Sequence, residues 1–193
     1  MFRMYCLLVA VSLVVGLGAP PAGAEPSLKI SLSREDPDVR SQKVADTDFV
    51  EFFLWIDGIQ TRGLEAGLVI EGGQFLAYVI DTSKPWIAMP LIDPYPATIS
   101  QVVAGDACHE APCYFGRILV RPDEPGGKIT VNVVPSERSQ VATIMNCFNQ
   151  PSESLRAYPA AVNAVPDRAY QVRGEIPGPG GVITPREKEG SAE

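Results

Sequence analysis

Histidine and cysteine are scarce in this chain. Its 193 residues include one histidine, His109, and four cysteines. A Ser-His-Asp or Cys-His catalytic site would have to use that single histidine, and no nucleophile elbow or glycine-rich oxyanion loop accompanies it. We therefore predict no catalytic residue, no metal site and no cofactor, with His109 as a surface loop residue.

Basic residues and helical periodicity are also in short supply. Lysine and arginine number 16 against 23 acidic residues, a net charge of −7. A chain this acidic has no basic stripe for phosphates, which argues against a nucleic-acid partner. No apolar face with a 3.6-residue period extends over a useful length of residues 25–150, whereas 18 prolines and 17 glycines favour short strands joined by turns.

The first 24 residues have the pattern of a secretory signal peptide. Arg3 supplies the positive start, residues 7–17 the apolar segment, and Ala22-Gly23-Ala24 the small-residue cleavage site. Roughly eleven apolar residues are too few for a membrane-spanning helix, which needs about 20. We therefore expect a secreted protein, periplasmic or extracellular, without a transmembrane segment in the mature chain.

The stretch 49–80 predicts three successive β-strands, around which the rest of the chain is organised. Phe, Val, Ile, Trp and Tyr favour strands, and the turns Asp57-Gly58 and Gly72-Gly73 separate residues 49–56, 64–71 and 74–81. The first and third of these strands are apolar on both faces, which is typical of strands in the middle of a sheet or covered on their outer side.

Alternating and apolar segments predict about five more strands, at residues 28–32, 97–103, 114–120, 129–133 and 142–148. The proline-rich segment 81–96 predicts an edge or an irregular crossover, because proline cannot donate to a strand ladder. Residues 105–112 are expected to form a loop. Eight strands separated by turns indicate an all-β, antiparallel β-sandwich over residues 25–150, followed by an irregular or disordered tail, residues 151–193.

The segment GLEAGLVIEGGQFLAY, residues 63–78, resembles the early pair of strands in cohesin-like and carbohydrate-binding-module-like sandwiches of exported bacterial proteins. The run ILV…KITVNVVP…ATIMNC resembles their closing strands, so the likeness covers residues 28–148. The chain lacks a dockerin-like calcium loop. The resemblance implies a sandwich fold, of the jelly-roll or cohesin-like kind, and a binding or scaffolding role, without naming a partner.

Three cysteines remain after the signal peptide, an odd number for an oxidising compartment. The first pairing expected is Cys108–Cys113, and Cys147 is the alternative partner for either of them. The same three cysteines together with His109 contain the donor atoms of a tetrahedral zinc site, but Cys108 and His109 are adjacent, which is poor geometry for two ligands of one ion.

Flat aromatic rings are the best lead to a ligand. Trp55, Trp86 and Tyr95 have the chemistry to stack on sugars, although their simplest role is packing. We therefore expect a secreted, non-catalytic β-sandwich module that binds a protein or glycan, or has a structural role in the envelope. The alternative is a secreted glycoside or ester hydrolase using surface carboxylates, with Glu51, Glu65 and Glu71 as candidates.

Overall fold

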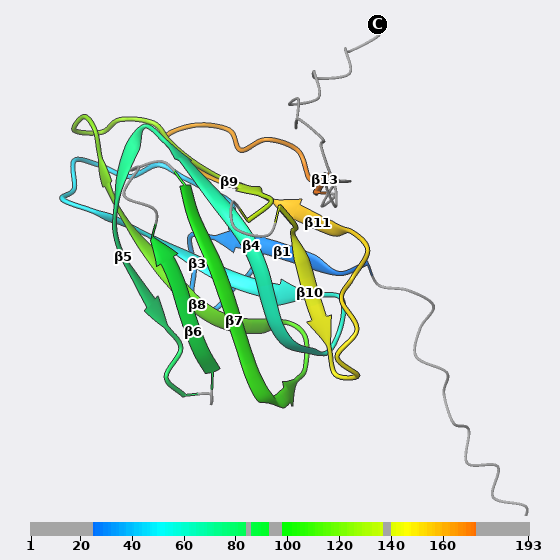
Figure 1. Ribbon diagram of the computed structural model, residues 1–193. Coiled ribbons are helices and arrows are strands. Elements are labelled where there is room, and N and C mark those ends of the chain that lie inside the picture. Colours follow the sequence, from blue (N-terminus) through cyan, green and yellow to red (C-terminus); the bar gives the residue numbers. More distant parts are fainter. Residues whose placement is uncertain (1–24, 84–85, 93–97, 137–139, 173–193) are drawn as a thin grey trace, which may run out of the picture.

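The computed structural model describes residues 25–83, 86–92, 98–136 and 140–172, with stretches 86–92 and 98–106 described by their backbone (Figure 1). The predicted signal peptide, Tyr95 and residues 173–193 lie outside these ranges. Within them, every regular element is a strand, and none is a helix that could cross a membrane.

The strands are β1 (Ser27–Ser31), β2 (Ser41–Gln42), β3 (Val50–Asp57), β4 (Thr61–Glu71), β5 (Gly73–Ile80), β6 (Trp86–Ile92), β7 (Thr98–His109), β8 (Cys113–Pro122), β9 (Ile129–Val134), β10 (Thr143–Asn146), β11 (Leu155–Tyr158), β12 (Ala160–Val162) and β13 (Tyr170–Val172). Each strand expected from the sequence has a counterpart in this set. Residues 155–172 add three further strands.

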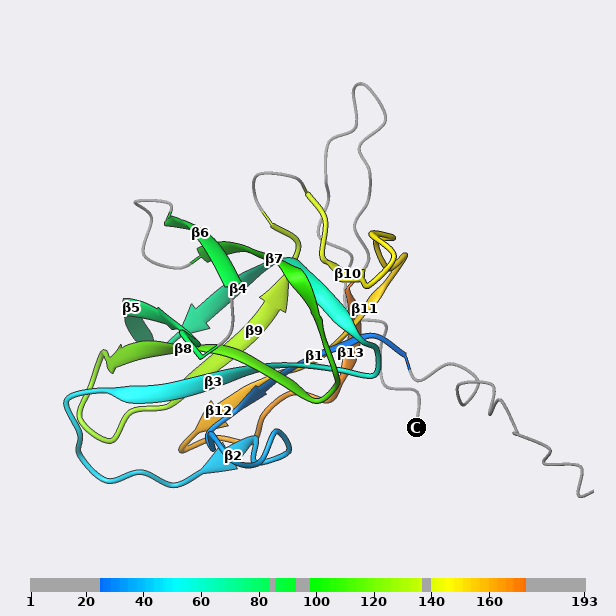
Figure 2. The ribbon, with the colours of Figure 1, turned by 90° about the horizontal axis from the view of Figure 1, so that it is seen from below.

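The strands form two sheets stacked face to face (Figures 1 and 2). Sheet A has the order β13-β11-β1-β3-β8-β5, and sheet B has the order β2-β12-β9-β4-β7-β6, with β10 beside the first half of β4. The predicted all-β sandwich is confirmed. Both sheets are mixed, because β11 runs parallel to β1 and β12 runs parallel to β2.

Alternate residues of the strands fill the space between the sheets. Phe52, Leu54 and Ile56 of β3 are fully buried, and β4 contributes every second residue from the opposite sheet, Leu64, Ala66, Leu68 and Ile70. Because successive side chains of a strand point to opposite faces, this alternation fixes which side chains of each sheet face outward. The charged residue between Phe52 and Val50, Glu51, is therefore on the outer face of sheet A.

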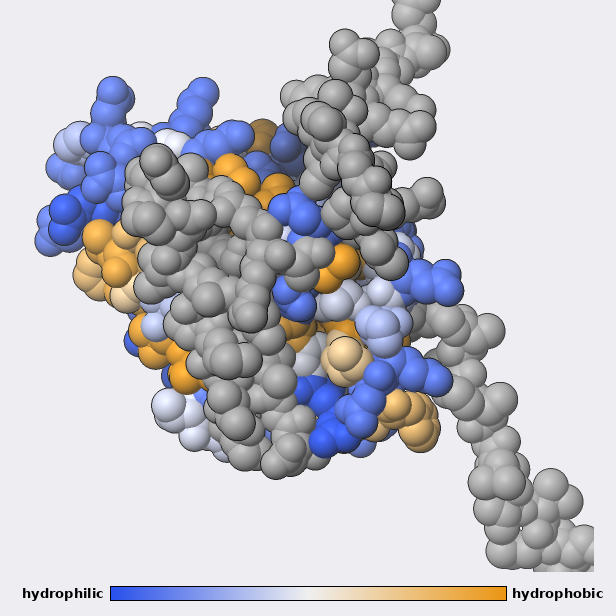
Figure 3. Space-filling model, in the orientation of Figure 1, coloured by the Kyte–Doolittle hydropathy of each residue, from blue (hydrophilic) through white to orange (hydrophobic). Residues whose placement is uncertain are grey.

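Two details of the strand predictions are corrected. β5 is an edge strand of sheet A, not a central or covered one, and its Leu76 and Val79 are 40% and 39% exposed. Figure 3 shows apolar surface along this side of the molecule. The predicted loop 105–112 is strand as far as His109, because β7 pairs with β4 again at Thr61↔His109 after a register shift beyond Gly63↔Ala104.

The structured part of the chain extends beyond the predicted boundary at residue 150. β11 pairs with β1 in sheet A, and β12 pairs with β9 in sheet B after only one intervening residue, Pro159. Tyr170 of β13 then connects the two sheets: its hydroxyl donates to the carbonyl of Val133 in β9 and accepts from the Val133 amide, both at 2.8 Å. Short strands such as these carry too few residues for a clear alternating pattern.

Candidate functional site

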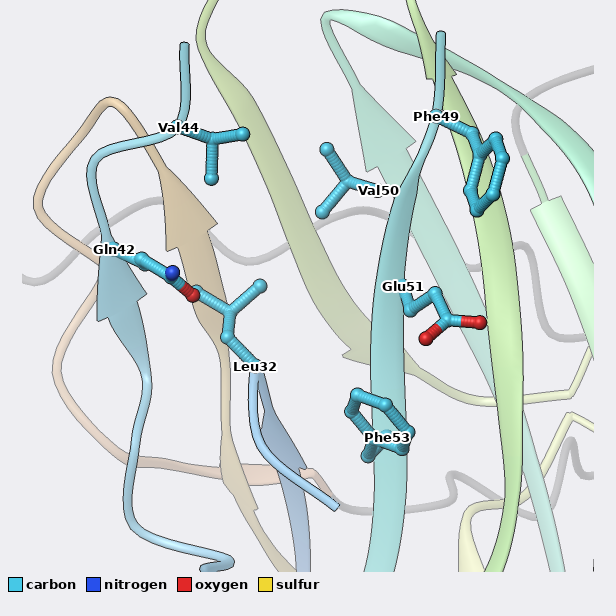
Figure 4. A pocket seen from close by; sticks show the side chains of 7 residues that line it. All are labelled: Leu32, Gln42, Val44, Phe49, Val50, Glu51 and Phe53. Carbon is cyan, nitrogen blue, oxygen red and sulfur yellow. The ribbon is translucent and has the colours of Figure 1, made fainter. Parts of the chain in front are cut away.

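A groove of about 280 Å³ lies beside the first half of β3 (Figure 4). We call it the β3 groove and define it by its lining residues, Leu32, Gln42, Val44, Phe49, Val50, Glu51 and Phe53. Val44 on one wall and Val50 on the other point toward each other in Figure 4. The volume is at the lower end for small-molecule sites, so the groove is too small to enclose a drug-sized ligand.

The groove exists because β1 is shorter than its neighbour β3. Pairing between the two ends at Ser31↔Phe53, whereas β3 remains paired with β8 back to Val50↔Val120. The chain leaves the sheet after Ser31, whose hydroxyl donates to the carbonyl of Asp36 at 2.6 Å. Among the strands that the structure describes, only β8 therefore lies beside Val50, Glu51 and Phe52.

The opposite wall, residues 42–44, is held by Asn163. The side-chain oxygen of Asn163 accepts from the Val44 amide at 2.9 Å, and its amide nitrogen donates to the Val44 carbonyl at 3.0 Å. The same nitrogen contacts the carbonyls of Gly126 and Gly127. Asn163 has φ of 55°, a left-handed conformation that asparagine tolerates better than most residues. One side chain thus fixes the position of this wall.

The groove has little net charge. Its one carboxylate, Glu51, pairs with Arg117 of β8, with 3.3 Å between Oε1 and Nε. The other lining residues are apolar apart from Gln42, and Phe49 is the most exposed of the apolar ones, at 46%. The groove therefore suits an uncharged, partly apolar ligand.

An ion cluster lies farther along β1 and β3, at the other end of their pairing. The Lys29 ammonium is 2.9 Å from Asp57 and 2.8 Å from Asp38. Burial alone would lower the pKa of Lys29, but the hydrogen bonds and charges of the two aspartates outweigh it, so the pKa is raised. For Asp57, burial is likewise outweighed by Lys29 and the Gly58 amide, and the pKa is lowered. Two carboxylates share one ammonium here, so the cluster keeps a net negative charge, and the Asp38 side chain is 68% exposed.

Aromatic side chains cover the outer face of sheet A next to the groove. The ring centroids of Trp55 and Tyr114 are 5.3 Å apart, those of Phe53 and Tyr114 are 6.2 Å apart, and the Arg34 guanidinium lies 5.6 Å from the Tyr114 ring. Burial raises the pKa of Tyr114. Trp55 is only 9% exposed. Its ring is used for packing and lacks the open face that stacking on a sugar requires.

Of the other two residues expected to bind a sugar, Trp86 is described by its backbone only. Trp86 is the first residue of β6, the edge strand of sheet B, where its backbone pairs with Gly105 of β7. It therefore belongs to the opposite sheet from Trp55. Tyr95 lies outside the described residues. The backbone thus places Trp55 and Trp86 on strands of different sheets.

The disulfide joins Cys108 to Cys147, the alternative partner, rather than to Cys113. The strand register supplies the reason. His109 and Asn146 both pair with Thr61, one from each side of β4, and the neighbouring cysteines meet with their Cα atoms 5.5 Å apart, within the normal range. Cys113 is only 2% exposed, and it begins β8 in the other sheet. The disulfide also takes up two of the four candidate zinc donors.

The carboxylates considered for hydrolysis are on different sheets. Glu51 is on sheet A, and Glu65 and Glu71 are on β4 of sheet B. Glu71 accepts a hydrogen bond from the Thr130 hydroxyl at 3.0 Å. Six positions of strand separate Glu65 from Glu71, about 20 Å. His109 ends β7, paired with Thr61. Among the described residues no cluster of three His, Cys, Asp or Glu side chains has metal-binding geometry.

Sequence reasoning missed the far wall of the β3 groove. Leu32, Gln42 and Val44 fall in or beside a segment that reads as a polar loop. Val44 is an apolar residue in that loop, and it packs against the hydrophobic core. An isolated valine between polar residues is too weak a signal to predict which strand it will face.

No protein-family model matches this chain, and no curated protein matches it either. Solved cohesin structures do resemble its fold. A non-cellulosomal cohesin from Archaeoglobus fulgidus has a TM-score of 0.53 at 6% identity, covering 72% of this chain and 90% of that one. The cohesin module of a Clostridium perfringens family 33 glycoside hydrolase has a TM-score of 0.50 at 10% identity, covering 77% and 95%.

A third similar structure is the OlpA cohesin of Clostridium thermocellum, solved in a type I cohesin–dockerin complex. Its TM-score is 0.51 at 7% identity, and the match covers 70% of this chain and 97% of that one. At such identities the likeness concerns the fold. The predicted resemblance to cohesin-like sandwiches is confirmed at that level.

Proposed function

We propose that this protein is a non-catalytic binding module for a protein partner and that the β3 groove is part of its contact surface. The observation that carries the proposal is the groove itself, which is apolar and open, with its one carboxylate neutralised by Arg117. Such a surface suits contact with another polypeptide, whose binding relies on apolar anchors and main-chain hydrogen bonds. The OlpA cohesin, of similar fold, meets a dockerin in its solved complex.

We place the module outside the cytoplasm. The signal-peptide pattern of residues 1–24 supports export, and a Cys108–Cys147 disulfide suits an oxidising compartment. A protein partner is favoured over a glycan because Trp55 is buried against Tyr114. Binding is favoured over hydrolysis because Glu51 is on a different sheet from Glu65 and Glu71.

Affinity capture with matched surface variants tests the proposal. The wild-type protein, Phe49→Ala and Phe148→Ala are used as baits against an envelope extract of the organism that makes the protein. Phe49 is 46% exposed in the groove, and Phe148 is 83% exposed beyond β10, so both substitutions should leave the fold intact. We expect a partner that is retained by the wild type and Phe148→Ala but weakened for Phe49→Ala, with binding reproduced between purified components.

The proposal fails if no protein is retained reproducibly, or if the purified components do not bind. A chromogenic glycoside and ester panel addresses the hydrolase alternative. Turnover by the wild-type protein that disappears in Glu51→Gln, Glu65→Gln or Glu71→Gln would replace binding with catalysis.

A further inference from the structure

We propose that the partner enters the β3 groove as an extended, uncharged peptide segment and adds a strand to sheet A alongside Val50–Phe52. This inference rests on the proposed protein-binding function and specifies how the partner is recognised. The segment would occupy the line that β1 would follow if it continued past Ser31.

The strand register identifies the main-chain groups that would bind the segment. In a strand, the N–H and C=O of successive residues point to opposite edges. The Leu32 amide donates to the Val39 carbonyl, and the Pro26 carbonyl accepts from the Arg156 amide of β11. The main-chain N–H and C=O groups of even-numbered residues between 26 and 32 therefore point away from β3. The main-chain groups of the odd-numbered residues therefore point toward β3, and the last of these residues, Ser31, pairs with Phe53.

Glu51 precedes Phe53 by two residues, so its N–H and C=O must point to the same edge of β3 as those of Phe53, the edge that faces β1. The pairing of β3 shows no irregularity with β1, and its one register shift with β8 falls between Leu54 and Trp55, beyond Glu51. No strand of the described chain lies on that side of Glu51. A donor and an acceptor on one residue are the pair that an added antiparallel strand engages.

The chemistry of the walls defines the side chains of the added segment. Val50 and Val44 are apolar on the two sides of the groove, and Phe49 and Phe53 extend the apolar surface along β3. Glu51 is paired with Arg117 at 3.3 Å, so a charged residue in the segment would gain no unpaired countercharge. An extended segment rich in β-branched or aromatic residues, without proline, satisfies both the backbone edge and the walls.

A displayed library of random 12-residue peptides, selected on the full-length protein, supplies the probe. We expect enriched peptides with a short uncharged β-forming run. A synthetic copy of one of them should bind Phe49→Ala at least tenfold more weakly than the wild type and bind Phe148→Ala within twofold. On binding, hydrogen exchange of the Glu51 amide should slow by at least tenfold, measured by NMR.

A scan of single N-methylations along the peptide gives the decisive signature. Methylation removes one N–H donor, so the largest loss of affinity should fall at the one position whose N–H meets the Glu51 carbonyl, with smaller losses at the two adjacent positions. Failure to enrich any peptide, equal affinity for Phe49→Ala, or equal losses at every position of the peptide would each overturn strand addition.

Two other occupants are separate outcomes, and both overturn the proposal. If the Glu51 amide is already protected in the free protein and loses protection when the chain is truncated after Val172, residues 173–193 occupy the groove. If protection rises with protein concentration, a second copy occupies it. A captured partner that binds Phe49→Ala normally and leaves Glu51 exchange unchanged would overturn strand addition and the part of the β3 groove in the contact surface, and only the protein-binding function would stand.

Discussion

Loss of the Cys108–Cys147 disulfide should cost this domain a large part of its stability. The two cysteines are 39 positions apart, and closing a loop of that length in the unfolded chain contributes about 4 kcal/mol. A Cys108–Cys113 pairing would close a loop of only a few residues and contribute about 2 kcal/mol. The size of the effect therefore distinguishes the two pairings, and so does the choice of cysteine removed.

Urea unfolding of single-cysteine variants measures the effect. Cys147→Ala should lower the unfolding free energy by about 4 kcal/mol, which corresponds to a midpoint shift of about 2 M urea for a domain of this size. Adding reductant should destabilise the wild type by a similar amount and leave Cys147→Ala unchanged. Cys113→Ala should keep its sensitivity to reductant, because Cys113 lies outside the disulfide.

Peptide mapping tests the cysteine pairing independently. Cleavage after glutamate at Glu110 separates Cys108 from Cys113, so the non-reduced digest should contain a fragment with Cys108 linked to one with Cys147. A Cys113→Ala protein that loses its response to reductant, or a digest in which Cys113 carries the cross-link, would refute the pairing and the register argument behind it.

Three smaller perturbations test other parts of the structure. Tyr170→Phe removes both hydrogen bonds to Val133 and should lower the free energy of unfolding by about 2 kcal/mol, measured with urea. Burial raises the pKa of Tyr170 to about 12, so the wild type alone should lose that part of its stability between pH 10 and 12. An identical alkaline profile in the variant would contradict this role. Asp57→Asn should lower the free energy of unfolding by up to about 1 kcal/mol at pH 7. Because Lys29 holds the pKa of Asp57 below its ordinary value, the difference in stability between wild type and variant should vanish as the pH falls from 5 to 2. A difference that does not change with pH would refute the ion pair. Asn163→Ala should lower the free energy of unfolding by roughly 3 kcal/mol, because it loses hydrogen bonds and forces alanine into a strained φ. Asn163→Gly loses the same hydrogen bonds but adopts this φ without strain, so it should lower the free energy of unfolding by less. Equal unfolding free energies for the two variants would count against the strain.

Local patterns in the sequence determined the strands and the sandwich. Leu28 and Ile30 alternate with polar residues, and Ile129, Val131 and Val133 do so again. All five are buried in the structure. Such alternation depends on nearest neighbours along the chain and on the two-residue period of a strand, so it can be read without knowing the fold. The resemblance of residues 63–78 to cohesin-like sandwiches rested on the same kind of signal.

Tertiary structure alone decided which strands became neighbours. The apolar strand β5 lies at an edge, residues 155–172 enter both sheets, and Cys147 rather than Cys113 meets Cys108. The β3 groove likewise depends on where β1 stops relative to β3 and on Asn163, which is about 120 positions from Val44. These features come from pairings between distant segments, and the hydrophobicity of a segment shows that it will be buried without showing which partner will bury it.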